Sequence, residues 1–223
     1  MFISEGVVGQ GGTSMTRTTP TDWLDAGLAI LATDGPEAVT IDELCSRLDV
    51  TKGSFYHHFD GYADYETRLL EHFETEGTQE IIETVESEPT SEAKLYRLLD
   101  VVVAASRQAE SDPELAIRAW AQQDEAVRAV QERVDDRRIA YLRSLTTDIV
   151  DDDRADSLAT LLYAALVGCE QLHPPLRGDQ VRSLFDEILR GYGLPPTDHR
   201  DGPGESGSAQ TDGDGSGQRG DDS

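Results

Sequence analysis

The helical spacing of apolar residues along most of the chain is the feature that most constrains its fold. Between residues 19 and 196, large apolar side chains recur every three or four positions, and no strand-like alternation of useful length interrupts them. The clearest repeat, at i, i+3, i+4, i+7, i+8 and i+11, is Val181, Leu184, Phe185, Ile188, Leu189 and Tyr192. The pattern predicts an all-α protein.

Capping and helix-breaking residues divide this pattern into separate predicted helices. Helices are expected over residues 20–34, 52–58, 62–85, 91–110 and 179–192. A Thr-x-x-Glu capping box at residues 40–43 opens one further short helix. Three more helices are expected to begin at the N-caps Asp112 and Asp124 and at the acidic run 151–153.

Composition argues against several classes of protein. No run of 18 apolar residues exists, so a membrane-spanning helix is not expected, and the first 14 residues lack the pattern of a secretory signal. Cys45 and Cys169 lie far apart within apolar patterns, which predicts reduced core cysteines of a cytoplasmic protein. No catalytic motif, phosphate loop or metal-ligand pattern occurs, so the sequence predicts no enzyme, no cofactor and no metal.

The net charge of −25 points away from nucleic acid at first sight, because an acidic protein repels phosphate. The acid is spread along the whole chain, aspartate outnumbers glutamate by 25 to 19, and only Lys52 and Lys94 are lysines. We interpret this as adaptation to a salty cytoplasm such as that of haloarchaea, since the Debye length falls to roughly 3 Å at 1 M salt. The alternative is an acidic protein of an ordinary cytoplasm.

The functional signal lies in residues 40–59, TIDELCSRLDVTKGSFYHHF. Two short helices flank a tight turn, and the second is too short and too polar for a core helix, which indicates a helix-turn-helix whose second helix enters the DNA major groove. Phe55 is expected to hold that helix against the core. The residues offered to phosphates or base edges are Thr51, Lys52, Gly53, Ser54, Tyr56, His57 and His58.

From Trp23 through AGLAILATDGPEAVTIDELCSRLDV, and most sharply at TKGSFYHHF, the chain resembles the tetracycline-repressor (TetR) family of transcription regulators. The resemblance implies a dimeric repressor with a three-helix DNA-binding domain at residues 19–62 and a helical ligand-binding and dimerisation body at residues 63–196. Segments 1–18 and 197–223 are predicted to be disordered, and Met15 is an alternative start to Met1. The positions matching the family's DNA contacts are Thr40, Thr51, Lys52, Gly53, Ser54, Tyr56 and His57.

Two departures from the family pattern concern DNA binding. The segment after Phe59 has no basic residue to meet phosphate, and residues 15–75 contain four basic and twelve acidic side chains. Asp49 stands where the family often has glycine in the turn, and aspartate tolerates left-handed backbone geometry better than most residues. In concentrated salt the weaker phosphate attraction matters less, because the counterion-release contribution fades.

The partners implied are a palindromic double-stranded DNA operator, a second copy of the chain, and an unknown small apolar or amphipathic effector that binds between the fifth and eighth helices. Ala164, Ala165 and Gly168 favour dimerisation through the last two helices, although these faces could instead bury within one chain. The rival to a repressor released by its effector is a helical dimer with a degenerate helix-turn-helix that acts through protein contacts. Residues whose place in a pocket stays open are Arg118, Trp120, Gln122, Tyr141 and His173.

Overall fold

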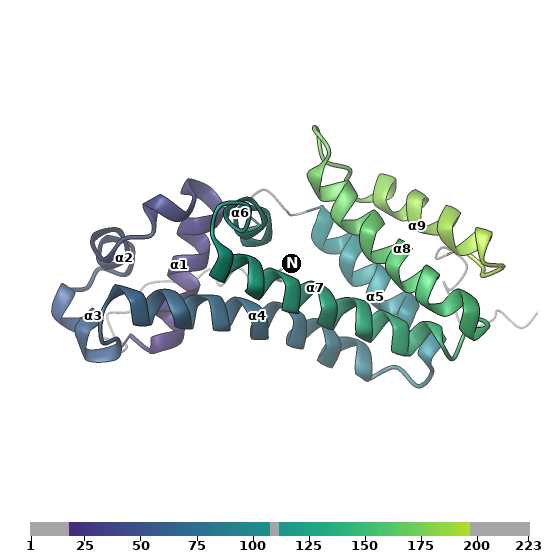
Figure 1. Ribbon diagram of the computed structural model, residues 1–223, viewed down its shortest axis with the longest axis horizontal. Helices are drawn as coiled ribbons and strands as arrows, with labels where there is room; N and C mark the ends of the chain where they lie inside the picture. The colour runs from purple at the N-terminus through teal and green to yellow at the C-terminus, as the bar shows by residue number, and fades with distance from the viewer. Residues whose placement is uncertain (1–17, 108–111, 197–223) are drawn as a thin grey trace, which may run out of the picture.

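The computed structural model describes residues 18–107 and 112–196, and this part of the chain consists of helices and their connecting turns, with no strand (Figure 1). The predicted all-α class, with a helix-turn-helix near the N-terminus, is confirmed. The predicted disordered ends, residues 1–18 and 197–223, lie outside the described residues except for Thr18. The helices are α1 (Pro20–Asp34), a 3-10 turn η1 (Pro36–Ala38), α2 (Ile41–Leu48), α3 (Lys52–His58), α4 (Tyr62–Glu86), α5 (Ser91–Ser106), α6 (Pro113–Trp120), α7 (Glu125–Thr146), α8 (Asp152–Gln171) and α9 (Asp179–Gly191).

Side-chain caps set most of the helix starts, as the sequence predicts. Thr40 accepts the N–H of Glu43 at 3.2 Å, Asp112 accepts that of Glu114, and Asp124 accepts those of two residues that follow it. A capping box that sequence analysis missed opens α1, where Thr19 and Asp22 each accept the other's backbone N–H. The fifth helix ends at Ser106, four residues before the predicted end, and residues 108–110 lie outside the described part.

Two apolar cores lie at opposite ends of the elongated molecule (Figure 1). The first joins α1, α2 and α3 to the N-terminal halves of α4 and α7 and to α6. The second joins α5, α8 and α9 to the C-terminal halves of α4 and α7. The helices α4 and α7 therefore run through both cores and connect the two ends. Both cysteines, Cys45 and Cys169, are buried and unbridged, as predicted.

The first core is built around Trp23, which packs edge-to-face against Phe55 and Phe59 with ring centroids 5.4 and 6.4 Å apart. Tyr65 of α4 completes the cluster, and its hydroxyl donates to the backbone carbonyl of Trp23 at 2.9 Å. Gly27 makes this contact possible, because a Cβ atom at that position would lie only 1.9 Å from the Tyr65 hydroxyl. The close approach of α1 to α4 therefore requires glycine at residue 27.

Within the described residues, no helix combines the length and the hydropathy that a bilayer span requires.

We expect Gly27→Ala to lower the free energy of unfolding by about 2–3 kcal/mol, because the added methyl group displaces the Tyr65 hydroxyl from a buried hydrogen bond. Denaturant unfolding followed by circular dichroism measures the change. The control is Gly53→Ala, whose Cβ would lie 3.6 Å from its nearest neighbour, the Thr51 hydroxyl, and which should cost nothing. Equal stability of Gly27→Ala and the parent would contradict this account.

Candidate functional site

The turn between α2 and α3 has the tight geometry that the sequence predicts. Asp49 adopts a left-handed conformation, with φ 54° and ψ 46°, directly after the last residue of α2. Its backbone N–H bonds back to the carbonyls of Cys45 and Ser46, and Val50 N–H bonds to Cys45 at 3.0 Å. The expectation that Asp49 occupies this conformation is confirmed, and the turn fixes the direction in which α3 leaves.

One side of α3 is anchored and the other is open to solvent. Phe55 is fully buried among Trp23, Phe59 and Tyr65, so the inner face of the helix cannot turn outward. Tyr56, the next residue, is 59% exposed, which is unusual for a large aromatic side chain. Of the other residues predicted to contact DNA, Ser54 and His58 are half-buried, and the exposed ones are Thr40, Thr51, Lys52, Gly53 and His57.

The hydroxyl of Thr51 does not cap α3, although Thr51 occupies the N-cap position with extended backbone. The sequence makes Thr51 a natural cap for a helix over residues 52–58, and this prediction is wrong in its hydrogen bond, because the side chain accepts no N–H from the first turn of the helix. At the same end of the helix, Gly53 has no side chain and therefore leaves its backbone accessible.

Two cations near α3, Lys52 and Arg68, are engaged by the chain itself. Lys52 Nζ lies 2.6 Å from a carboxylate oxygen of Asp42 in α2, and this hydrogen bond raises the pKa of Lys52. Arg68 of α4 donates to the carbonyl of His58 at 2.9 Å and stacks over the ring of Phe59. Any phosphate that approaches Lys52 must therefore compete with Asp42.

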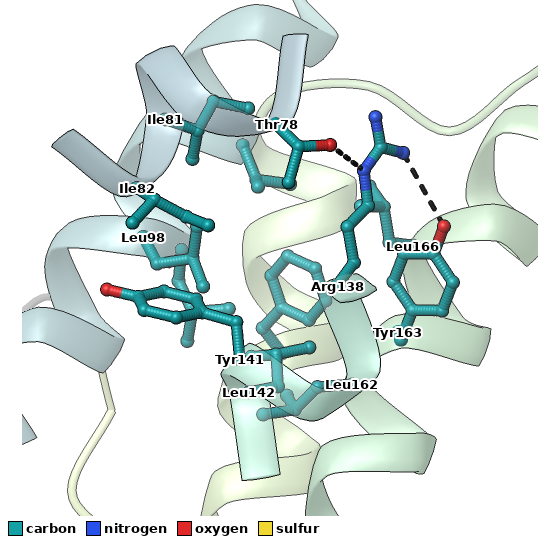
Figure 2. A pocket seen from close by; sticks show the side chains of 13 residues that line it. Thr78, Ile81, Ile82, Leu98, Arg138, Tyr141, Leu142, Leu162, Tyr163 and Leu166 are labelled. Carbon is teal, nitrogen blue, oxygen red and sulfur yellow. Dashed lines mark hydrogen bonds between the residues drawn. The ribbon is translucent and has the colours of Figure 1, made fainter. Parts of the chain in front are cut away.

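A second candidate site is an apolar cavity of about 70 Å³ in the other half of the molecule (Figure 2). Helices α4, α5, α7 and α8 form its walls, and Phe185 of α9 closes one side. Its remaining lining residues are Thr78, Ile81, Ile82, Leu98, Leu99, Val102, Arg138, Tyr141, Leu142, Leu162, Tyr163 and Leu166.

A buried polar cluster lies beside the cavity, between the two apolar cores. Glu114 of α6 is 2% exposed and pairs with Arg118 at 2.8 Å and with Arg138 of α7 at 2.7 Å. Arg118 also pairs with Asp135, which accepts a hydrogen bond from the hydroxyl of Tyr163. Burial opposes the ionisation of Glu114, but positive charges that include the two arginines outweigh it and hold its pKa well below the usual range.

Sequence reasoning missed Glu114 and Arg138. Arg118 was considered for a pocket and lies in the cluster next to it, whereas Gln122 is exposed. Tyr141 lines the cavity and donates its hydroxyl to Glu86. The signal available in the sequence was the position of Arg138 on the apolar stripe of α7, where a charge requires a buried partner.

The histidines noted in the sequence form no metal cluster, since no group of three or more potential ligands exists within the described residues. His57 and His58 lie next to each other on α3, with ring centroids 5.0 Å apart. His173 is exposed at the end of α8, contacts the carbonyl of Gln171, and does not line the cavity.

The outer face of α8 is apolar and unusually exposed. Leu161 and Leu172 are 44% and 51% exposed, and with Tyr56 they are the exposed large hydrophobic residues of the described part. Ala164 and Gly168 lie between them at helical spacing, and a Cβ atom on Gly168 would meet no atom within 4 Å. Half-buried Leu184 and Ile188 of α9 belong to the second core but are not fully covered.

Residues 24–63, from α1 to the start of α4, match the sequence model of a family described as bacterial regulatory proteins, tetR family. No curated protein matches the chain significantly. The fold resembles a TetR-family transcriptional regulator from Streptomyces coelicolor, with a TM-score of 0.64, 18% identity, and coverage of 77% of this chain and 88% of that one.

Two further regulators are similar. One, from Rhodococcus sp. Rha1, has a TM-score of 0.59 and 18% identity over 80% of this chain and 100% of that chain. Another, from Saccharomonospora viridis and solved in complex with choline, has a TM-score of 0.60 and 18% identity over 77% of this chain and 95% of that chain. At these identities the likeness establishes the fold.

The half-buried carboxyl of Glu170 in α8 generates a prediction about pH. Burial, together with the negative charges of Glu114 and Asp112, raises its pKa to about 7. The folded-state pKa lies above the unfolded value of about 4.3, so the stability from this group is complete below about pH 4 and is lost as pH rises to about 7. Removing the charge should therefore stabilise the protein increasingly from about pH 4 to about pH 7, and by the full amount above that.

We expect Glu170→Gln to exceed the parent in free energy of unfolding by about 1–3 kcal/mol at pH 8, and by less at pH 5. Denaturant unfolding across this pH range measures the difference. Glu132→Gln, at an exposed position of α7, is the matched control for removing one negative charge. Identical pH profiles for the two variants would contradict the raised pKa.

Proposed function

We propose that this chain is a dimeric repressor that a small molecule releases from a palindromic operator. Its residues 24–63 match the sequence model of the tetR family of regulatory proteins, and its fold resembles that of a TetR-family transcriptional regulator. In this proposal residues 19–62 bind DNA, and residues 63–196 form the ligand-binding and dimerisation body. The protein acts in a cytoplasm rich in salt.

The observation that supports DNA binding is the outer face of α3. Its inner face is fixed by Phe55, while exposed Tyr56 and the short side chains at its N-terminal end leave a helix that fits the major groove. Thr40, Thr51, Lys52, Gly53, Ser54, Tyr56 and His57 are the proposed contacts. Most of these side chains are uncharged, so recognition rests on base edges and shape more than on phosphate attraction.

Concentrated salt resolves the conflict between this proposal and the charge of −25. Because screening at molar salt confines charge effects to a few ångströms, the acidic surface repels DNA weakly there. The pair between Lys52 and Asp42 is also exposed and is weakened by salt, which makes the lysine more accessible to phosphate.

The exposed stripe of Leu161, Ala164, Gly168 and Leu172 supports dimerisation through α8 and α9. Small residues at its centre allow a second helix to approach closely, and two copies would form a four-helix bundle across a two-fold axis. A dimer also presents two copies of α3 to two half-sites, as a palindromic operator requires.

The helix α4 supports coupling between effector and DNA. Its N-terminal part holds Tyr65 in the first core, and its C-terminal part supplies Thr78, Ile81 and Ile82 to the cavity wall. A ligand that fills the cavity can release DNA if it binds the two positions of α4 unequally.

We expect Lys52→Ala/Tyr56→Ala to lower the affinity for operator DNA at least about tenfold in molar KCl, because both side chains lie on the outer face of α3. The operator is first selected from fragmented genomic DNA of the source organism, and affinity is then measured by fluorescence anisotropy. Lys94→Ala, which removes the only other lysine, from α5, is the matched control and should bind as the parent does.

Asp42→Asn should strengthen binding in dilute KCl and have no effect in molar KCl, since it removes the competitor for Lys52. If the parent selects no DNA fragment from about 0.1 to about 3 M KCl, the repressor proposal fails and the rival, a dimer acting through protein contacts, is favoured.

We expect Gly168→Arg to convert the dimer to a monomer, because a long charged side chain replaces the small residue at the centre of the stripe. Helix propensity favours arginine over glycine, so the fold should persist. Light scattering after gel filtration in molar KCl measures the mass, and Gln122→Arg at an exposed position of the other end is the control. A dimer of unchanged stability in Gly168→Arg would exclude this interface.

A further inference from the structure

The side chains that line the cavity beside the buried polar cluster indicate the chemistry of the molecule that it binds. Most of its lining is aliphatic, and the polar groups among its lining residues are the hydroxyls of Thr78, Tyr141 and Tyr163 and the guanidinium of Arg138. Figure 2 shows Thr78, Arg138 and Tyr163 next to one another, joined by hydrogen bonds, while Ile81, Ile82 and Leu98 gather elsewhere on the wall. The Tyr141 hydroxyl lies apart from these hydrogen-bonded groups, on the side of Leu98, so the cavity is apolar with its other polar groups gathered at one end.

The hydroxyl groups of this wall already have partners. Tyr141 donates to Glu86 at 2.8 Å, Tyr163 donates to Asp135 at 2.8 Å, and the hydroxyl oxygen of Thr78 accepts from Arg138 Nε at 3.1 Å. None of them needs a ligand to satisfy these bonds.

Arg138 differs from them in having one buried donor without a partner. Its Nη1 donates to both carboxylate oxygens of Glu114 at 2.7 Å, and its side chain is 13% exposed, yet Nη2 is buried and bonds to nothing in the described part of the chain. In a guanidinium group Nη2 shares an edge with Nε, so this donor lies on the side that faces Thr78. A buried N–H without an acceptor costs about 1–3 kcal/mol.

The charges of the ion pairs at this end of the cavity balance one another, and the nearby carboxyl of Glu170 does not line the cavity. Arg118 and Arg138 carry two positive charges, and Glu114 and Asp135 carry two negative ones, all held in ion pairs of 2.7–2.8 Å. A charged ligand would add an uncompensated charge to a buried site, which is costly. The site lacks one hydrogen-bond acceptor, and it does not lack a counter-ion.

We infer that the cavity binds a small, neutral, mostly apolar molecule with one hydrogen-bond-accepting oxygen, which receives the Nη2 proton of Arg138 beside Thr78. The carbonyl of a ketone or ester and the oxygen of an alcohol share this chemistry. The inference rests on the proposed function, because it names the effector class of that regulator. The cavity volume of about 70 Å³ is below the ~150 Å³ of an apolar cavity that holds benzene. A molecule of the size of benzene or larger therefore binds only if the helices around the cavity move apart.

The test compares three six-carbon probes that differ in charge: 2-hexanone, hexanoate and hexylammonium. Binding to the full chain in molar KCl is measured by isothermal titration calorimetry. We expect 2-hexanone to bind at least about tenfold more tightly than either ion. Tighter binding of hexanoate or of hexylammonium, or binding of none of the three, would overturn the inference.

Two variants locate the binding. Arg138→Lys keeps the charge that Glu114 requires but removes Nη2, and we expect it to weaken 2-hexanone binding at least about tenfold. The matched control is Arg133→Lys, on the outer side of the same helix, which should bind as the parent does. Because Arg138→Lys can lose stability, Leu98→Trp, which fills the cavity from α5, is the second variant and should abolish binding. Unchanged 2-hexanone binding in both cavity variants would contradict the site.

Operator release is measured separately, with operator DNA and 2-hexanone together. Release by the ketone supports both the inference and the proposed function. If the ketone binds the cavity but leaves DNA affinity unchanged, the ligand class stands and ligand control of DNA binding fails. If an ion binds more tightly and releases the DNA, the proposed function stands and the inference fails.

Discussion

The pairing of buried Glu114 with two arginines is the interaction on which the rest of the body depends. It joins α6 to α7, and through Asp135 and Tyr163 it reaches α8, at the level where the two apolar cores meet. Removing one partner of such a cluster leaves an uncompensated buried charge and costs several kcal/mol. The cluster therefore specifies how the helices cross, whereas the apolar cores on either side would tolerate small shifts. It also gives the neighbouring cavity its polar end.

Local signals predicted the helices well and their packing poorly. The first and third helices run from residue 20 to 34 and from 52 to 58 as expected, because caps and breakers next to them decide where they begin and end. The left-handed conformation of Asp49 could likewise be predicted from the sequence. Glu114, by contrast, has the local pattern of a first-turn acid that favours the helix dipole, and its burial follows from Arg138 on another helix. Long-range partners of this kind have no local signature, so neither the cluster nor the cavity was predicted.

The candidate DNA-binding face could be located from sequence because its motif is contiguous, but its electrostatics could not. Composition showed an excess of acid, and the structure shows where one of those acids acts: Asp42 holds Lys52 at 2.6 Å. Arg68 is likewise committed to the carbonyl of His58 and the ring of Phe59. A face on which these two cations are held within the chain discriminates more by shape and base edges than by charge. This is the property expected of recognition in a solvent that screens phosphate strongly.

The length of α4 has a mechanical consequence. With 25 residues at 1.5 Å each, the helix spans about 37 Å, from the aromatic cluster under α3 to the wall of the cavity. A rigid rod of that length converts a tilt of about 5° at one end into a displacement of about 3 Å at the other, which is close to the rise of one base pair. A displacement of about the size of a methyl group where α4 lines the cavity is therefore enough to move α3 out of register with the major groove of DNA.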